Sequence, residues 1–529
     1  MFKRNRKRVL VFVTVICVAV LFCLVLVMAQ RPRQVTIAAN RTIYLRGGQD
    51  LQAALLTARF GDTIVLESGA TFKGPIVLPY KAGTGDYITI RTSDLAGVSR
   101  DGERIKPAIH ARAMPKIVAP PNQSAVTTKS GAHHYKFVGV EFLTTNTGYV
   151  HNVIDLGASD YRSLSEFPSH LIFDRCYVHS TGLNRARRGF ALNSSETSIV
   201  NSHISGFAGA ADETQAIAGW NGPGPFRVVN NYLEGAGEVV MFGGADPSIP
   251  GLVPSDIEIR RNHLRKPKEW LGRAAIKGTF ELKNARRAVI EGNWIESEIL
   301  TTAVVLTVRN QNGKAPWSTL EDIVFKNNVV RHADTGVNLL GIDNDHASQT
   351  AKRIRIANNL FINIVVNHRD NIPYFLQTNG GEQVTVEHNT VEHAGNVITA
   401  YGNPTRNFVF RGNIVQVNQY GIVCMTDGVA CSRQNYFCNC FPRAVIQGNI
   451  FVDNLGVANN ERLDENYPQG NYFVTSFQRV GFADYQHGDW RLGASSKTRD
   501  KTINGLPPGA DVDAIRAAGA FSARTGSGF

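Results

Sequence analysis

Four charged residues in the middle of the chain have the types needed for proton-transfer chemistry. They are Glu281 and Lys283 in FELKNARRAVIEGNW, Arg309 in TVRNQNG and Asp343 in GIDNDH. A second cation beside a lysine disfavours its charged form, so stacking Lys283 on Arg309 would favour a basic lysine. Such a lysine could remove a proton next to a carboxylate, while Arg309 neutralises that carboxylate or protonates the leaving oxygen. Glu281 and Asp343 would orient the two cations or hold a cation.

An alternative chemistry needs only the two carboxylates. If Glu281 and Asp343 lie two strands apart in a parallel stack, the strand spacing separates them by about 9.6 Å. Inverting glycoside hydrolases require carboxyl groups roughly 6.5 to 9.5 Å apart. The Asp-rich and Gly-His-Gly signatures of polygalacturonases are missing. Inverting hydrolysis is therefore the second enzymatic hypothesis.

Short internal repeats must position these residues. An octapeptide with alternating apolar residues recurs from KFVGVEFL at 136 to AVIQGNIF at 444. Its ten intervals cover 308 residues, an average of about 31. The shared position holds Glu141, Cys176 and Ser202 in the first copies, and then Asn231, Asn262, Asn293, Asn328, Asn359, Asn389, Asn413 and Asn449.

This period predicts a parallel β-helix. Repeats of this length without an amphipathic helix exclude βαβ units and helical leucine-rich repeats. Asparagine amides stacked at one corner would hydrogen-bond along the axis and satisfy groups that cost about 1 to 3 kcal/mol each when buried unpaired. We predict an all-β, single-stranded, right-handed parallel β-helix, a solenoid of about eleven or more turns.

The N-terminus indicates export. Residues 1–29 combine five Lys or Arg with an apolar run from Val9 to Ala29. This pattern is typical of a cleaved signal peptide, or of an N-terminal anchor that attaches the chain to a membrane through residues 9–29. We therefore expect a secreted, periplasmic or cell-surface protein.

The remaining sequence divides into two parts. We assign residues 35–490 to the β-helix domain and 491–529 to an irregular C-terminal cap or tail. Apolar residues at helical spacing between Leu51 and Ala58 predict a short N-terminal helix that caps the first turn.

Charge favours a polyanionic partner. The formal net charge is +12, and ten Lys or Arg against three Glu fall between Ile257 and Arg287. A cationic surface attracts polyanions. Nucleic-acid motifs are absent from the sequence. For an exported chain, we expect a monomer that binds an acidic polysaccharide and does not bind nucleic acid.

A second strand of each repeat defines the expected binding surface. With Phe280 and Leu282 facing inward and Leu282 aligned with Val308, an outward column places Lys283 about 4.8 Å from Arg309. Polar and aromatic side chains along one line are typical of saccharide binding. The substrate-binding candidates are Trp220, Asn193, Asn379, Tyr401, Arg265 and Lys277.

The chain resembles the right-handed parallel β-helix proteins of the pectate-lyase-like superfamily over essentially everything after residue 35. Lys283 in ELKNARRAVIEGN and Arg309 in TVRNQNG match the places of the base lysine and the arginine in chondroitinase B and the related alginate lyases. RNQNG lacks the histidine of that family, and its acidic calcium cluster is not identifiable. The resemblance implies a polysaccharide lyase that cleaves a uronate-containing polymer by β-elimination. A non-catalytic carbohydrate-binding or structural β-helix of the cell surface is the alternative from another class.

Two further motifs have chemical potential. Calcium could bind through the oxygens of Asp246 in FGGADPS or of Glu281. A cysteine cluster lacks the paired spacing of zinc ligands, and outside the cytoplasm it predicts disulfides that close a long loop, with three pairings open. The cluster contains Cys424, Cys431, Cys438 and Cys440.

Overall fold

The chain divides into two compact units, Met1–Arg41 and Thr42–Phe529. All the elements below belong to the second unit. The expected signal peptide or anchor lies outside the described residues, and within those residues no helix is long and apolar enough to cross a membrane. The computed structural model describes residues 40–365, 373–418, 420–426, 429–430, 439–453 and 467–524.

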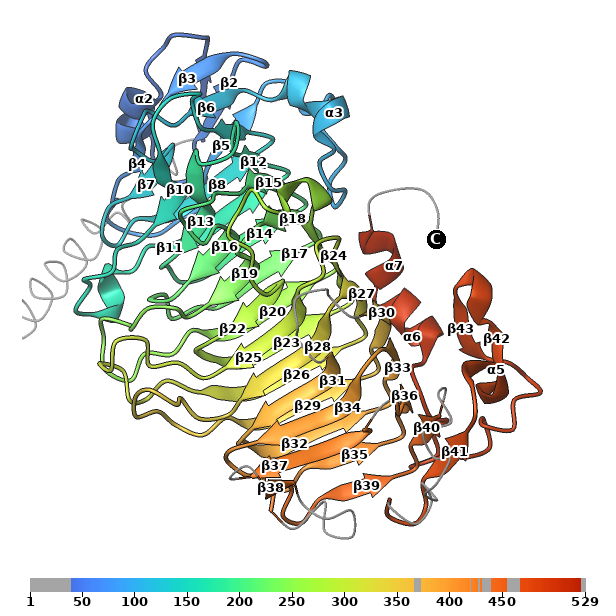
Figure 1. Cartoon of the computed structure of the whole chain (residues 1–529). Coiled ribbons are helices and arrows are strands. Elements are labelled where there is room, and N and C mark those ends of the chain that lie inside the picture. Colours follow the sequence, from blue (N-terminus) through green and yellow to red (C-terminus); the bar gives the residue numbers. More distant parts are fainter. Residues whose placement is uncertain are drawn as a thin grey trace, which may run out of the picture. The chain divides into compact units, whose positions relative to one another are not determined.

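Most of the second unit consists of three long sheets, named A, B and C here (Figure 1). In spatial order, sheet A contains β1 (Thr42–Leu45), β2 (Thr63–Leu66), β5 (Ile88–Thr92), β8 (His133–Val138), β11 (Ser169–Asp174), β14 (Thr197–Val200), β17 (Phe226–Val229), β20 (Ser255–Arg260), β23 (Ala285–Glu291), β26 (Leu320–Lys326), β29 (Lys352–Ala357), β32 (Glu382–Glu387), β35 (Val409–Arg411) and β39 (Val445–Gln447). Sheet B contains β3 (Thr71–Lys73), β6 (Lys116–Val118), β9 (Glu141–Leu143), β12 (Tyr177–His179), β15 (His203–Phe207), β18 (Tyr232–Gly235), β21 (His263–Lys266), β24 (Trp294–Ser297), β27 (Val329–Ala333), β30 (Leu360–Ile364), β33 (Thr390–His393), β36 (Ile414–Gln416), β40 (Ile450–Val452) and β41 (Tyr472–Val474). Sheet C contains β4 (Ile76–Leu78), β7 (Val126–Thr128), β10 (Val150–Leu156), β13 (Ala186–Leu192), β16 (Gln215–Gly219), β19 (Glu238–Phe242), β22 (Phe280–Leu282), β25 (Thr302–Thr307), β28 (Thr335–Leu340), β31 (Tyr374–Asn379), β34 (Asn396–Tyr401), β37 (Ile422–Thr426) and β38 (Val429–Ala430).

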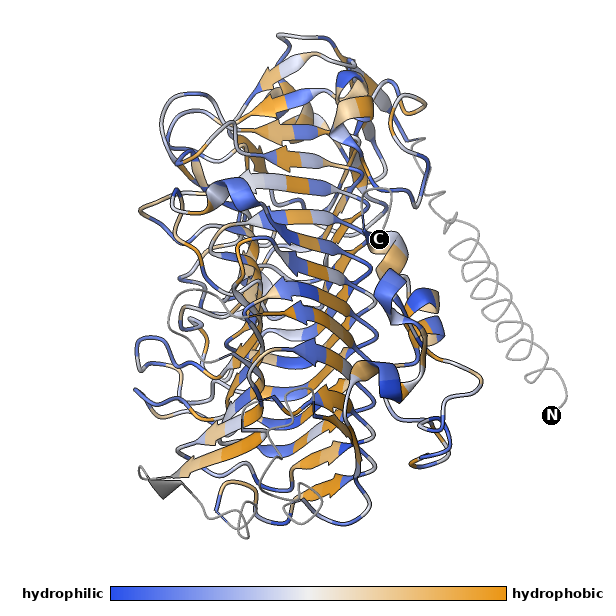
Figure 2. Ribbon diagram, turned by 45° about the vertical axis from the view of Figure 1, so that its right-hand side comes forward, coloured by the Kyte–Doolittle hydropathy of each residue, from blue (hydrophilic) through white to orange (hydrophobic). Residues whose placement is uncertain are grey.

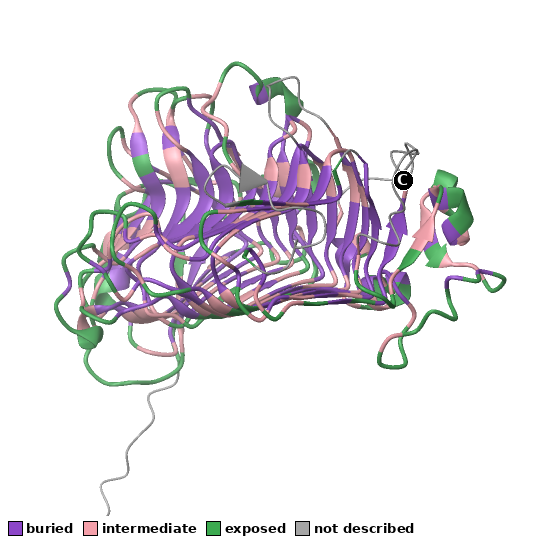
Figure 3. Cartoon of the chain, turned by 60° about the horizontal axis from the view of Figure 1, so that its bottom comes forward, coloured by how far each residue is buried: buried purple, intermediate pink, exposed green. Residues whose placement is uncertain are grey.

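Successive strands of the chain visit sheets A, B and C in turn, and each strand pairs in parallel with its equivalent in the next turn. The inward side chains of one turn, Ile259, Leu264 and Phe280, are all 0% exposed. Apolar residues recur along the strands in Figure 2, and Figure 3 shows the strands largely buried. The predicted parallel β-helix is confirmed.

The predicted asparagine ladder runs along the corner between sheets A and B. The Asn262 backbone N–H and Nδ2 both donate to Asn293 Oδ1, at 2.9 and 3.1 Å. Asn262 Nδ2 also donates to the Val228 carbonyl at 2.9 Å. The pattern repeats as far as Asn449, which donates to Asn471, one step beyond the predicted ladder.

The start of the ladder differs from the prediction at Glu141. Strand β9 aligns Glu141 with Tyr177, so Val140, not Glu141, is equivalent to Cys176. Val140 is fully buried, and the Glu141 carboxylate instead contacts His179 Nε2 at 2.9 Å. Hydroxyl and amide groups therefore form the ladder only from the Cys176–Ser202 step onward, where the Cys176 N–H donates to Ser202 Oγ.

Helices are few and short in the described residues. Near the start, α2 (Leu51–Thr57) forms where the spacing predicts a helix, and it buries Leu51 and Leu55 in the main core. Asp50 caps it by accepting the Ala53 N–H. The others are α3 (Pro107–His110), α5 (Phe477–Val480), α6 (Val512–Ala517), α7 (Ala520–Ala523), and the 3-10 turns η1 (Ala111–Ala113), η2 (Leu164–Glu166), η3 (Lys268–Trp270) and η6 (Tyr485–His487).

The C-terminal segment lies along the outer face of sheet B. It contains α5, the antiparallel hairpin of β42 (Phe482–Asp484) and β43 (Asp489–Leu492), and then α6 and α7. Phe477 and Ile515 of this segment share an apolar cluster with Trp294 and Ile450 of sheet B. The segment therefore covers strands from several turns of the solenoid, as Figure 1 shows for α6 and α7.

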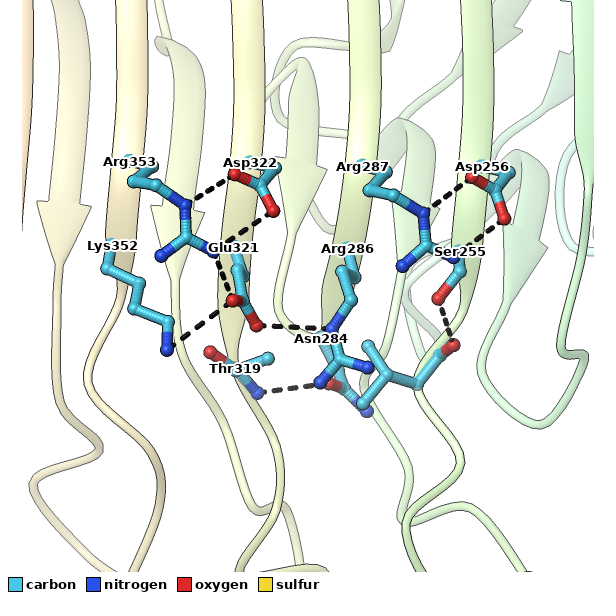
Figure 4. A network of polar contacts seen from close by, with 11 residues as sticks. Ser255, Asp256, Asn284, Arg286, Arg287, Thr319, Glu321, Asp322, Lys352 and Arg353 are labelled. Carbon is cyan, nitrogen blue, oxygen red and sulfur yellow. Dashed lines mark hydrogen bonds and ion pairs between the residues drawn. The ribbon is translucent and has the colours of Figure 1, made fainter.

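Ion pairs across the strands of sheet A neutralise much of the basic segment (Figure 4). Arg287 binds Asp256 of the preceding turn at 2.7 Å, and Arg286 lies 3.2 Å from Glu321 of the next. Within residues 257–287, six of the ten cations pair with described carboxylates, and these cations are distributed over all three sheets. The basic run therefore does not form one cationic patch.

The asparagine ladder should be a large source of stability. Replacing Asn293 by Ala leaves the buried donors of Asn262 without their acceptor and removes the amide donor to the Ile259 carbonyl. We expect the free energy of unfolding to fall by about 3 kcal/mol or more, measured by urea denaturation. Asn312→Ala is the control, because that exposed side chain makes no hydrogen bond to the described residues. Equal midpoints for the two variants would contradict the assignment.

Candidate active site on sheet C

The register of sheet C differs from the predicted one. Leu282 pairs with Leu306, not with Val308, and Leu306 pairs with Leu339, not with Leu340. The segments VVLTV and NLLGI have apolar residues at consecutive positions, and both faces of these strands are largely buried. The alternation of apolar and polar residues alone therefore could not determine which side chains of these strands face inward.

Arg309 lies beside Lys283 through its backbone, but its side chain has other partners. The Arg309 N–H donates to the Lys283 carbonyl at 2.9 Å. The Arg309 guanidinium donates to Asp343 at 2.9 Å and to Asp345 at 3.3 Å. The predicted contact of Arg309 with Asp343 is present, whereas the ion partner of Lys283 is Glu281.

Asp343 is committed to the local loop. Its side chain is 1% exposed, and it accepts the backbone N–H groups of Asn310 and Asp345 besides the Arg309 guanidinium. Those donors hold the pKa of Asp343 below its usual range, against the effect of burial. A carboxylate with these three contacts anchors the loop and has little capacity left to activate water.

A buried carboxyl pair is the chemically distinctive feature of sheet C. Glu281 in β22 and Glu238 in the neighbouring β19 are 6% and 0% exposed. Glu238 Oε2 accepts a hydrogen bond from Gln215 Nε2 at 2.7 Å, but no donor serves the buried Glu238 Oε1 in the described residues. A protonated Glu281 can supply that donor. Burial, followed by the charge of Glu238 and a hydrogen bond to it, raises the pKa of Glu281 to about 7, although Lys283 acts in the opposite direction.

Three lysines surround this pair. Lys283 Nζ lies 3.6 Å from Glu281 Oε1, and its side chain is 14% exposed. Lys277, which is more exposed, binds Glu213 at 2.5 Å and acts electrostatically on Glu281. Lys266 is fully buried and donates to the carbonyls of the 235–237 corner, and burial lowers its pKa to about 7. The site can therefore store and exchange protons near neutral pH.

A polar row leads away from the carboxyl pair across the sheet. Arg188 Nε donates to Gln215 Oε1 at 2.9 Å, and its guanidinium lies over the Trp220 ring at 4.9 Å from the ring centre. The predicted site residues did not include Arg188, Gln215 or Glu238. The available signal was an acid or amide opening an otherwise apolar strand, as in QAIAG and EVVMF.

The predicted substrate-binding asparagines are turn residues. Asn193 is 2% exposed, and its side-chain oxygen accepts the backbone N–H groups of Trp220 and Asn221. Asn379 accepts the Asn403 N–H in the same way at 2.9 Å. Tight corners at the end of sheet C need such acceptors, so these amides serve the fold.

The other predicted binding residues lie on two different faces. Arg265 belongs to β21 of sheet B and binds Glu298 at 2.7 Å and the Tyr232 hydroxyl at 3.1 Å, so it does not share a face with Lys283. Trp220 and Tyr401 follow or end strands of sheet C and are partly exposed. Their role in binding remains a prediction.

The described residues supply only some of the oxygen ligands that a calcium site would need. Among the described residues, no group of three or more His, Cys, Asp or Glu side chains is arranged to hold a metal ion. Asp246 accepts the backbone N–H groups of Asn312 and Lys314 at 3.0 Å. Glu238 and Glu281 are the carboxylates that could contribute to calcium binding, but calcium takes six to eight oxygens. Further ligands would have to come from water or substrate, so no step below depends on calcium.

One disulfide joins two of the predicted cysteines. Cys424 and Cys440 are bonded, at a sequence separation of 16. Cys431 and Cys438 lie outside the described residues. Cys176, at its place in the ladder, is a buried free thiol.

Several solved structures resemble this chain. A variant of the PL6-family alginate lyase AlyGC has 13% identity and a TM-score of 0.48, covering 92% of this chain and 59% of its own. A mannuronic-acid-specific polysaccharide family 6 lyase from human gut microbiota has 11% identity and a TM-score of 0.45, covering 82% and 91%. A variant of the periplasmic alginate epimerase AlgG has 10% identity and a TM-score of 0.35, covering 82% and 83%.

This chain thus spans 59% of the length of AlyGC. No protein-family model matches the sequence, and no curated protein matches it. At these identities and TM-scores, the site has to be judged by its own geometry.

The raised pKa of Glu281 should make stability depend on pH. A carboxyl group whose pKa rises from 4.5 to about 7 on folding stabilises the protein fully below pH 4.5 and loses that contribution as the pH rises through 7. Glu281→Gln keeps a donor for Glu238 and cannot ionise. The melting temperature of the wild type should therefore fall relative to Glu281→Gln over this range. Glu269→Gln, at an exposed site, is the control, and parallel curves for all three proteins would exclude the protonated pair.

Proposed function

We propose that the protein is a polysaccharide lyase that cleaves a uronate-containing polymer by β-elimination at Lys283 and Glu281. The observation that carries this proposal is the 3.6 Å contact between Lys283 Nζ and a carboxyl group whose pKa is near 7. Elimination next to a carboxylate needs a base and an acid that exchange protons near neutral pH. We assign the base to the Lys283 amine and the acid to Glu281, which lie within one contact.

The reaction balances with these groups alone. Lys283, as the amine, takes the proton from C5 of the uronate, and the electrons of that bond form the C4–C5 double bond as the C4–O4 bond breaks. Protonated Glu281 gives its proton to the leaving O4. The proton on Lys283 then returns to Glu281 across their contact, and the site is restored. Since both groups lie together, they would act from the same side of the sugar.

The substrate carboxylate needs a cation to stabilise negative charge that develops during proton removal. Lys277 is suited to this role because its side chain is 46% exposed and it already influences Glu281. Glu213 would exchange its ion pair for the substrate carboxylate. Arg309 is less suited, because its guanidinium already has the carboxylates of Asp343 and Asp345 as partners.

The contacts of Asp343 weaken the hydrolase alternative. An inverting enzyme needs a carboxylate free to activate water. Asp343 is buried under three donors, and the Glu281 carboxyl group interacts with Glu238 by charge and hydrogen bonding. Lyase chemistry therefore accounts better for the groups on sheet C.

Lys283→Ala should abolish most of the activity. Removal of a general base typically costs about 10²- to 10⁴-fold, so kcat/KM should fall by this factor on the preferred polymer. The assay incubates the full chain with alginate, pectate and glycosaminoglycans and follows the ultraviolet absorbance of the unsaturated product.

The matched control is Lys352→Ala, because Lys352 forms an exposed ion pair with Glu321 on sheet A. It should leave kcat/KM unchanged. Undiminished activity in Lys283→Ala would contradict the proposed mechanism. Absence of product from every uronate polymer, despite binding, would favour a non-catalytic carbohydrate-binding protein.

Lys277→Ala should affect substrate binding more than turnover. Losing one charge-assisted contact is worth roughly tenfold, so KM should rise by about this factor while kcat changes less. Steady-state kinetics on the same polymer measures both constants. A fall in kcat with constant KM would assign Lys277 to the chemical step instead.

A further inference from the structure

A second candidate binding site lies at the far end of sheet B, on a different sheet from Lys283 and Glu281. A cavity of about 540 Å³ opens between β41 and the C-terminal segment. This volume is in the range of pockets that bind small organic ligands. Its lining consists of Ile450, Tyr472, Phe473, Val474, Thr475, Arg479, Lys497, Thr498 and Lys501.

The charged side chains of this lining are all cations. Arg479, Lys497 and Lys501 line the cavity, and no acidic residue of the described part of the chain does. None of the three forms an ion pair with a carboxylate of the described residues, in contrast to most cations of the basic run on the β-helix. Three unneutralised cations around one cavity create a positive potential that favours an anionic ligand.

The remaining lining groups suit a sugar better than a bare oxyanion. Tyr472 is 36% exposed, with Lys501 Nζ at 4.8 Å from its ring centre, and Thr475 and Thr498 add hydroxyl groups. A single phosphate or sulfate could contact only part of a 540 Å³ cavity. A sugar offers hydroxyl groups for the threonines, apolar ring hydrogens for the tyrosine and an acidic group for the cations.

We propose that this cavity, lined by Arg479, Lys497 and Lys501, binds a short acidic saccharide without cleaving it. No described acid or base pair comparable to Glu281 and Lys283 lines the cavity, so binding is the only role assigned. The acidic group could be a carboxylate or a sulfate, because arginine and lysine bind both. The site is independent of the chemistry proposed for sheet C.

Titration calorimetry on the full-length Lys283→Ala protein tests this assignment, because that background prevents turnover. The probes are a trigalacturonate, a trimannuronate, a sulfated disaccharide, a neutral trisaccharide and inorganic phosphate. We expect saturable binding of at least one acidic saccharide, weaker at high salt because exposed charges are screened. The neutral trisaccharide should not bind, and phosphate should bind more weakly than the saccharide.

Variants locate the binding. Lys497→Ala and Arg479→Ala, made separately, should each lower the affinity for the acidic saccharide by about tenfold, which is the contribution of one charge-assisted contact. Arg491→Ala is the matched control, because Arg491 lies in the same segment, pairs with Asp489 and does not line the cavity. Thermal unfolding of each variant confirms that it is folded.

Three results would overturn the assignment: no binding of any acidic saccharide, equal affinity in the folded cavity variants and in Arg491→Ala, or phosphate binding as tightly as the saccharides. A failed lyase assay leaves this test intact, because calorimetry detects binding at the cavity whether or not sheet C is catalytic. Conversely, if Lys497→Ala keeps lyase activity but loses the binding detected by calorimetry, the two sites are separate.

Discussion

Stacking of buried amides along one corner is the constraint on which the rest of the structure depends. Each asparagine from Asn231 to Asn449 uses its side chain to satisfy backbone groups of its own and neighbouring turns. A parallel solenoid has to bury these corners, and a buried polar group without a partner is expensive. The ladder therefore fixes the order of the turns and the inward phase of sheets A and B, while the segments between sheets B and C remain free to vary.

The candidate active site lies on sheet C, next to these variable segments. The connection from β21 to β22 covers residues 267–279, whereas the one from β24 to β25 covers only 298–301. Connections of different length deliver neighbouring strands to sheet C at different offsets. In the register of β19 and β22, Glu281 aligns with Met241, and its carboxyl group interacts with Glu238 at the start of β19.

Charge is handled differently on the three sheets. On sheet A, cations and carboxylates alternate from turn to turn and neutralise one another, as Figure 4 shows, and such exposed pairs contribute little to stability individually. On sheet C, burial and the neighbouring Glu238 raise the pKa of Glu281 to about 7. At the end of sheet B, three cations line a cavity and form no ion pair with a carboxylate of the described residues. Among the described residues, only the last two arrangements leave charged or ionisable groups that can act on or bind a ligand.

The sequence by itself determined the solenoid, since the asparagine at intervals near 31 residues and its flanking alternation have one physical explanation, a stacked corner. It also singled out Glu281, Lys283 and Lys277 as candidates, because charged residues near strand ends stand out from an apolar background, and their roles stay predictions. It could not identify Glu238, nor the register of β25 against β22, because consecutive apolar residues such as Val304, Val305 and Leu306 leave the strand phase open. Tertiary structure decided those points. Which side chains meet across a parallel sheet depends on connections whose length is visible in the sequence but whose path is set by packing.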